Sequence, residues 1–105
     1  MGTYNDNVTI NENTDLSVVV RIQPDNYEVS VELPAQSTGK QVIDSLIEEP
    51  SLGISRINQE GQPYIFRLVS KGTGVQIQEN VTLLDAGVKH NDTLLLFPVI
   101  EAGGI

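Results

Sequence analysis

The sequence predicts an α+β domain in which one helix packs across a mixed sheet of about five strands. Two hydrophobic patterns carry this prediction. Alternating apolar residues recur in several runs, as in half-buried strands, and one run among them has the 3.6-residue spacing of a helix. The length of 105 residues fits one small domain and leaves little room for a second. We therefore expect a single two-layer domain.

The first regular element is predicted to be a β-hairpin formed by residues 16–22 and 27–33. Apolar residues share one parity in each run: Leu16, Val18, Val20 and Ile22, then Tyr27, Val29, Val31 and Leu33. Pro24 presets its own φ and Asn26 tolerates a left-handed conformation, so the residues between the runs favour a turn. The opposite parity of the second run is polar, as a half-solvated antiparallel sheet requires.

A short helix is predicted between Thr38 and Pro50. Thr38 and Gln41 have the spacing of a capping box, in which each side chain covers a backbone N–H group that the helix leaves unpaired. Apolar residues then recur at helical spacing: Val42, Ile43, Leu46 and Ile47. Pro50 forbids continuation. A helix of about ten residues is short for independent stability, so its apolar face must pack against the hairpin.

The second half of the chain predicts three further elements and one turn. We expect a strand at residues 64–70, a short strand at 75–77, and a single helical turn at 82–87 that ends with Gly87 in a left-handed conformation. Residues 93–99 form the most apolar run, which is typical of a central, buried strand. This last strand is predicted to lie between the first and the third, parallel to the first.

The predicted domain covers residues 16–99. Residues 1–15 are too polar to offset the entropy of ordering, so they are expected to form a mobile N-terminal arm. Residues 100–105 contain nothing to cap or pair and are expected to form a flexible C-terminal tail. The predicted core is Val18, Val20, Val29, Val31, Ile43, Leu46, Leu94 and Leu96.

Composition narrows the classes of function. Fourteen acidic residues against six basic ones give a net charge of −8, a field that disfavours nucleic acid and anionic membranes as partners. There is no cysteine, and His90 is the single histidine, so a metal site and a catalytic triad are not expected. The chain is not expected to be an enzyme. It lacks a signal peptide and an apolar run of about 18 residues, so we expect a cytoplasmic protein.

The order of elements is that of the β-grasp fold, and residues 82–96 support a narrower comparison. This segment, TLLDAGVKHNDTLLL, resembles the segment of ubiquitin and of bacterial ubiquitin-like modifiers in which a Thr-Leu-x-Asp turn leads into the last strand. The Gly103–Gly104 pair near the chain end resembles the reactive end of the conjugated members. The resemblance covers roughly residues 16–104 and leaves residues 1–15 outside.

The resemblance implies a protein modifier that is activated at Gly104. A partner activating enzyme would use ATP to form an acyl-adenylate of the Gly104 carboxylate, so the chain itself needs no cofactor. A conjugating enzyme would then pass the chain to lysines of target proteins. Glycine has no Cβ, so Gly103 and Gly104, preceded by Glu101 and Ala102, suit a narrow channel. Ile105 would block that channel.

We therefore expect a peptidase, of the metallopeptidase class, to remove Ile105. The tail also departs from ubiquitin, because Glu101 stands where ubiquitin carries basic residues. An activating enzyme that reads positive charge there would not accept this chain. A dedicated bacterial set of partners is therefore expected.

Other interpretations of the tail remain open. Phe97–Pro98 followed by residues 102–104 is similar to the end of the sulfur-carrier proteins of molybdopterin and thiamine synthesis, although those end at the second glycine. Some bacterial β-grasp proteins accompany secretion machinery and are not conjugated. The free carboxylate and the Ile105 side chain would also suit a groove of another protein, and two terminal glycines often mark only a frayed end.

The resemblance also implies a contact patch at Leu95 and Phe97. Both have the parity opposite to Leu94 and Leu96, so they would lie on the outer sheet face, where ubiquitin carries part of its apolar binding patch. The alternative is that the N-terminal arm or a loop covers them. Surface lysines are candidate acceptors for chain formation, although such lysines are usually just solvated: Lys40, Lys71 and Lys89.

Overall fold

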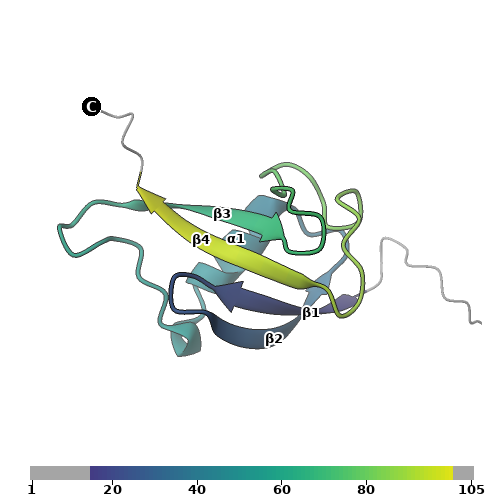
Figure 1. Ribbon diagram of the computed structural model, residues 1–105, viewed down its shortest axis with the longest axis horizontal. Helices are drawn as coiled ribbons and strands as arrows, with labels where there is room; N and C mark the ends of the chain where they lie inside the picture. Colours follow the sequence, from purple (N-terminus) through teal and green to yellow (C-terminus); the bar gives the residue numbers. More distant parts are fainter. Residues whose placement is uncertain (1–14, 101–105) are drawn as a thin grey trace, which may run out of the picture.

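In a computed structural model, which describes residues 15–100, the chain forms a two-layer α+β domain (Figure 1). Its four-stranded sheet has the order β2-β1-β4-β3. The strands are β1 (Asp15–Ile22), β2 (Tyr27–Pro34), β3 (Tyr64–Ser70) and β4 (Thr93–Ile100). The fold class is therefore confirmed, with one strand fewer than expected. The predicted arm, apart from its last residue, and the tail after Ile100 lie outside the described residues.

The predicted place of the last strand is confirmed. β4 lies at the centre of the sheet, parallel to β1 and antiparallel to β3. The hairpin is confirmed as well, because β1 and β2 pair antiparallel over their full lengths, from Asp15–Pro34 to Ile22–Tyr27. A strand that is hydrogen-bonded on both sides and buried on one face needs the apolar composition seen in β4.

The prediction of a short strand at residues 75–77 is wrong. This segment makes one isolated bridge, between Gln76 and Val69, and two backbone hydrogen bonds to the end of β3. Ser70 donates to the Val75 carbonyl at 3.0 Å, and Ile77 donates to the Leu68 carbonyl at 2.7 Å. Ile77 is 3% exposed in the core. Beyond it the chain bonds to the start of α1, through the Glu79 and Val81 carbonyls, so the pairing with β3 does not continue.

The predicted bounds of the domain are wrong by one residue at each end. Asp15 is the first residue of β1 and pairs with Pro34, so it does not belong to a mobile arm. Ile100 is the last residue of β4 and pairs with Tyr64, so it does not belong to a flexible tail.

The helix α1 (Gly39–Ile47) has the predicted capping box. The backbone N–H of Gln41 donates to the Thr38 hydroxyl at 3.2 Å, and the backbone N–H of Thr38 donates to the side-chain oxygen of Gln41 at 2.9 Å. Pro50 begins a separate 3₁₀ helix, η2 (Pro50–Leu52), instead of extending α1. The capping pair and Pro50 thus fix both ends of α1.

The start of α1 is also tied to the loop that precedes the last turn. Gly39 donates its N–H to the Val81 carbonyl at 3.0 Å, and Lys40 donates to the Glu79 carbonyl at 3.1 Å. A Cβ at Gly39 would lie 2.5 Å from the Gln78 carbonyl oxygen. Glycine is needed here because the two backbones approach too closely for any side chain.

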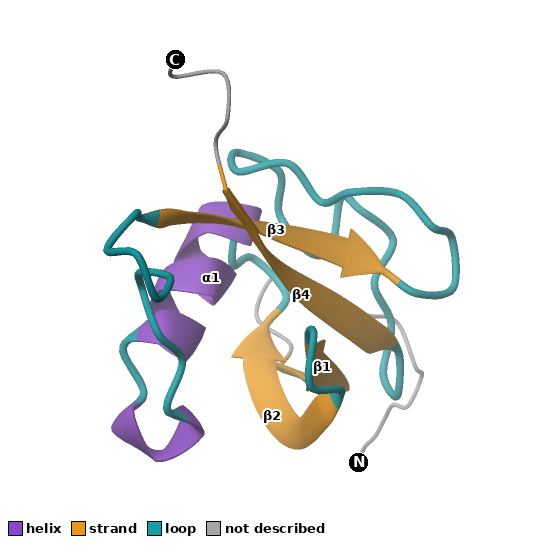
Figure 2. Ribbon diagram, turned by 60° about the vertical axis from the view of Figure 1, so that its left-hand side comes forward, coloured by secondary structure: helices purple, strands orange, loops and turns teal. Residues whose placement is uncertain are grey.

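The helix lies against one face of the sheet (Figure 2), and the core fills the space between them. Six of the eight predicted core residues are buried there. Val29 and Val31 have the predicted face but are only half-buried, because β2 is an edge strand and α1 does not close over it. The remaining buried apolar residues are Leu16, Leu33, Ala35, Val42, Leu68, Ile77, Leu83 and Val88.

The turn at residues 82–87 is helical, as predicted, and closes with a left-handed glycine. Ala86 donates to the Thr82 carbonyl at 3.0 Å. Gly87, at φ 80°, donates to Leu84, and Val88 donates to Leu83, which is the bond pattern of a Schellman ending. Leu83 and Val88 are buried, so this turn closes one end of the core.

Truncation of Leu46 tests whether α1 is held by its buried face. Leu46 is 4% exposed, and Leu46→Ala should lower the free energy of unfolding by about 2–5 kcal/mol through lost burial and the cavity left behind. Chemical denaturation would measure the loss. The exposed neighbour is the control, and Ser45→Ala should change stability by less than about 0.5 kcal/mol. A loss below about 1 kcal/mol for Leu46→Ala would contradict the packing.

Gly39→Ala tests the close approach at the start of α1. Helix propensity alone favours alanine over glycine by about 1 kcal/mol. The backbone oxygen that a Cβ would meet at 2.5 Å should reverse this preference and give a net loss of about 1–3 kcal/mol. Gly72→Ala is the matched control, since a Cβ there meets nothing within 4 Å. Equal melting temperatures for the two variants would rule out the close approach.

Candidate functional site

The outer face of the sheet, opposite α1, carries the predicted contact residues. Leu94 and Leu96 are 0% exposed in the core, so Leu95 and Phe97 between them point to the other face. In the register, Leu95 lies between Val69 of β3 and Arg21 of β1, and Phe97 lies opposite Arg67. The strand pairing therefore brings side chains from three strands together around Leu95.

These neighbours form a continuous apolar band, the outer stripe. Its members are half-buried apart from Ile65, which is 39% exposed. The helix and the groove-lining loop that follows it lie toward the other face (Figure 2), so within residues 15–100 they do not cover the stripe. A band of this kind is typical of a protein contact surface. The outer stripe consists of Val19, Ile65, Val69, Leu95, Phe97 and Val99.

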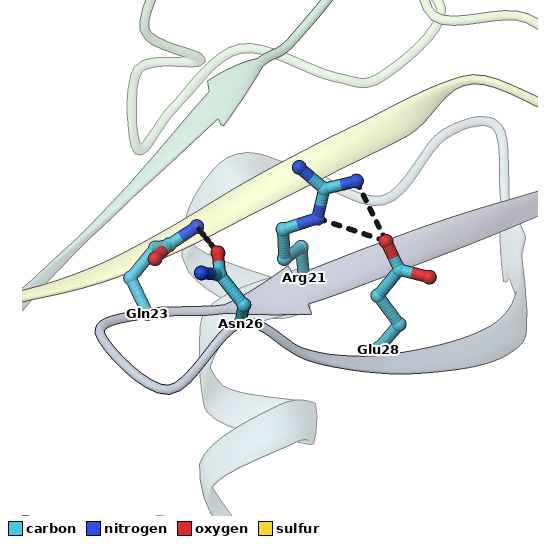
Figure 3. Close-up of polar contacts among 4 residues, drawn as sticks. All are labelled: Arg21, Gln23, Asn26 and Glu28. Atoms are coloured by element: carbon cyan, nitrogen blue, oxygen red, sulfur yellow. Dashed lines mark hydrogen bonds and ion pairs between the residues drawn. The ribbon is translucent and has the colours of Figure 1, made fainter.

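Arginines border the outer stripe on both sides. Arg21 forms an ion pair with Glu28, with its Nε 2.8 Å and one terminal nitrogen 2.6 Å from the same carboxylate oxygen (Figure 3). Arg67 is exposed and forms no ion pair within the part of the chain that the structure describes. Although the protein is acidic overall, Arg67 therefore offers a positive charge beside the outer stripe.

The ion pair between Arg21 and Glu28 was not predicted, although it follows from the pairing of the two hairpin strands. Arg21 and Glu28 are directly opposed across β1 and β2. The turn between them is held by a second polar contact, in which the Gln23 side-chain amide donates to Asn26 at 2.8 Å (Figure 3). Cross-strand pairs at such positions add to the stability of a hairpin.

The end of β4 fixes where the chain leaves the sheet. Its last residue, Ile100, pairs with Tyr64 at the start of β3. The predicted reactive and processing residues come directly after this point and lie outside the described residues: Glu101, Ala102, Gly103, Gly104 and Ile105.

A groove of about 650 Å³ lies beside the end of β4, and the sequence did not reveal it. Tyr64 and Phe66 form an edge-to-face pair in its lining, with ring centroids 5.8 Å apart. Pro98 lines it from the neighbouring strand β4, and Tyr27, which is 51% exposed, lines it from β2. The aromatic residues at alternate positions of β3 were the signal that could have indicated a shared face.

The three lysines considered as acceptors differ in their surroundings. The ammonium of Lys40 donates to Asp44 at 3.0 Å, and this hydrogen bond, with the attraction of the Asp44 charge, raises the pKa of Lys40. Lys71 and Lys89 are exposed.

His90, in the connection before β4, also has a structural contact. Its Nδ1 atom accepts a hydrogen bond from the Ser17 N–H at 3.3 Å. This contact joins the connection to the start of β1. Across residues 15–100, no group of three or more His, Asp or Glu side chains is placed to hold a metal ion.

Comparisons with known proteins agree with this architecture at the level of the fold. No protein-family model and no curated protein matches the sequence. Among solved structures, Caldiarchaeum subterraneum ubiquitin is 14% identical, covers 86% of this chain and 100% of its own, and gives a TM-score of 0.61. The chain has the ubiquitin-like β-grasp fold. At this level of identity, the likeness shows the fold alone.

Two further solved structures match over a similar share of this chain. The EccD5 ubiquitin-like domain from Mycobacterium xenopi is 18% identical over 85% of this chain and 99% of its own, with a TM-score of 0.65. A component of the ESX-5 inner membrane complex is 17% identical over 84% of this chain and 22% of its own, with a TM-score of 0.63. Within residues 15–100 of our chain, no helix is long and apolar enough to cross a membrane.

Truncations at adjacent positions of β4 test which face of the ubiquitin-like sheet is outer. Leu94→Ala should lower the free energy of unfolding by about 2–5 kcal/mol, because Leu94 is fully buried. Leu95→Ala should cost less than about 1.5 kcal/mol, since the half-buried side chain has less contact to lose. Equal losses in urea denaturation would show that Leu95 is not on an open face.

Proposed function

We propose that this chain is a ubiquitin-like protein modifier whose reactive group is the carboxylate of Gly104. The observation that carries the proposal is the place of the Gly103–Gly104 pair, which follows closely on the last strand of a ubiquitin-like domain. Residues 101–104 would span about 13 Å when extended. That length would let Gly104 enter a partner's active site while the domain stays outside.

In the proposed pathway, partner enzymes carry out each reaction of the tail. A metallopeptidase hydrolyses the peptide bond between Gly104 and Ile105. The freed carboxylate attacks the α-phosphate of ATP on an activating enzyme, which gives the acyl-adenylate and pyrophosphate. A cysteine thiolate of that enzyme displaces AMP, and a second thiolate, on a conjugating enzyme, takes over the acyl group. A lysine amine of the target displaces this thiolate and forms an isopeptide bond.

The outer stripe supplies the surface by which partners would recognise the modifier. Leu95 and Phe97 lie at its centre, and exposed Arg67 borders it. An apolar band gives contact area, and one available cation favours a partner with an acidic residue at its rim. Three residues of the stripe, Leu95, Phe97 and Val99, are on β4, the strand that leads to the tail, so a partner bound there would have the tail within reach.

Mass spectrometry of tagged protein from its native cells tests the proposal. The tag belongs at the N-terminus, so that the C-terminal tail stays native. Digestion after glutamate cuts behind Glu101 and would leave an Ala-Gly-Gly remnant on the ε-amine of each modified lysine. We expect such remnants on other proteins, together with a free form that has lost Ile105. The matched controls are Gly104→Val, which should abolish the remnants, and Gly72→Ala, which should leave them unchanged.

Two results would contradict this function. The first is a chain that always retains Ile105 and leaves no remnant when the other proteins of the cell are digested. The second is replacement of a carboxylate oxygen of Gly104 by sulfur, seen in the intact mass, which would identify a sulfur carrier.

The second candidate is a protein-binding module that is never conjugated. The likeness to the EccD5 ubiquitin-like domain favours it, because that structure matches over 85% of this chain with a TM-score of 0.65. In this case the outer stripe would be the working surface and the tail would be dispensable. Removal of residues 101–105 would leave the function intact, whereas Phe97→Asp would abolish partner binding.

A further inference from the structure

The groove beside the end of β4 gathers most of the aromatic side chains of the domain. The chain has five aromatic residues, three Tyr and two Phe, and three of the five line this groove: Tyr27, Tyr64 and Phe66. Pro98 lies among them. These four residues define the aromatic groove. Within residues 15–100, Phe97 is the only other aromatic residue, and it belongs to the outer stripe, so the groove is a separate candidate binding site.

The aromatic groove is the part of the helix side of the sheet that α1 does not cover. Tyr64 and Phe66 share the parity of Leu68, which is 0% exposed in the core, so all three face the helix side. None of residues 39–47 lines the groove, and its second wall is the loop of residues 52–55. The apolar face of β3 and β4 therefore continues past the helix, where its aromatic residues are only half-buried.

Hydrogen bonds within the chain fix both walls of the groove. On one side, the Gln23 N–H donates to the Leu96 carbonyl at 2.9 Å, and the Gln23 side chain donates to Asn26 at 2.8 Å, which holds the hairpin turn (Figure 3). On the other side, the Ser55 hydroxyl donates to the Ile57 carbonyl at 2.6 Å. Because the walls are already formed, a ligand would not have to order them on binding.

The lining offers hydrogen-bond donors and one unpaired negative charge. Within the part of the chain that the structure describes, the hydroxyls of Tyr27 and Tyr64 have no hydrogen-bond partner. Asp25 forms no ion pair there, whereas the Glu28 carboxylate is held by Arg21. No lysine, arginine or histidine lines the groove. The site therefore favours a ligand that combines hydrogen-bond acceptors, an apolar body and a positive charge.

A proline-rich segment in the polyproline II conformation has the acceptors and the apolar body. Proline has no N–H, so its backbone brings carbonyl acceptors without donors that would need partners in the groove. Aromatic-lined grooves are the usual docking sites of such segments. The groove crosses from β2 to β3 over three strand spacings, about 14 Å, which matches about five residues at a rise of about 3.1 Å each.

The chain itself does not supply such a segment, in cis or from a second copy. Its two closest prolines, Pro24 and Pro34, lie ten positions apart. Residues 1–14 and 101–105 contain acidic residues but no proline, lysine or arginine, so their charge is unfavourable beside Asp25. The net charge of −8 also disfavours self-association. The chemistry of the groove is therefore matched by a partner protein.

We propose that the aromatic groove binds a proline-rich segment of a partner protein, with its prolines packed against the aromatic rings and an arginine or lysine beside Asp25. The hydroxyls of Tyr27 and Tyr64 would donate to backbone carbonyls of the segment, which fixes its position along the groove. This interaction depends neither on conjugation through Gly104 nor on the outer stripe, which lies on the opposite face of the sheet.

The test uses the full-length chain and the peptide acetyl-Arg-Ala-Pro-Ala-Ala-Pro-Ala-amide, whose two prolines lie on one face of a polyproline II helix. An NMR titration should show saturable shifts of the ring signals of Tyr27, Tyr64 and Phe66, and much smaller shifts at Phe97. The same peptide with alanine in place of both prolines should bind at least about fivefold more weakly, because it loses the ring contacts and the pre-organised conformation. Glutamate in place of its arginine should also weaken binding, most strongly at low salt.

Matched variants separate the hydroxyl, the charge and the face of the sheet. Tyr64→Phe keeps the ring and removes only the hydroxyl, so it should weaken peptide binding about two- to tenfold. Asp25→Asn should weaken binding of the arginine peptide at low salt, whereas Glu32→Gln, which removes the same charge outside the groove, should not. Phe97→Leu changes the outer stripe and should bind the peptide as the native chain does.

Several outcomes would overturn the proposal. Equal affinity for the alanine peptide would show that the groove does not recognise proline, and loss of binding in Phe97→Leu alone would move the site to the outer stripe. Without peptide, groove signals that shift when residues 101–105 are deleted would assign the groove to the chain's own tail. Groove signals that shift with protein concentration would assign it to a second copy.

Discussion

The parallel pairing of β1 with β4 is the constraint on which the rest of the molecule depends. It places the most apolar strand at the centre of the sheet, so Leu94 and Leu96 face α1 and the opposite parity forms the outer stripe. It also brings the end of β1 beside β4, where Ile22 and Pro98 line the aromatic groove. The core, the contact face and the groove all follow from one register.

Local patterns in the sequence were enough to predict the hairpin, the capped helix and the central last strand. Each depends on residues close in the chain: the alternation around Pro24, the Thr38–Gln41 pair, and the apolar run that ends in β4. Gly39 shows the limit of this reasoning. Its need for glycine comes from Gln78, which is remote in sequence, and no periodicity carries that information.

Only one part of the candidate site was predicted from the sequence: the residues whose sheet face follows from the alternation of side chains along a strand. Leu95 and Phe97 follow from the face of Leu94, whereas the aromatic groove depends on how much of the helix side of the sheet α1 leaves open. For the same reason, burial of Val29 and Val31 was overestimated: alternation gives the face of a residue but not how well that face is covered. The segment at residues 75–77 is a similar case, because the chain that follows it bonds to the start of α1 and leaves it a single bridge to β3.

The direction of the central pair has a mechanical consequence. β1 enters the sheet at Asp15 and β4 leaves it at Ile100, and because the two strands are parallel these points lie at opposite ends of the pair. Tension applied between the two ends of the chain would load the hydrogen bonds between β1 and β4 together, in shear, and not one after another. A force that pulls the two ends apart would therefore have to break this pair as a unit before the strands could separate.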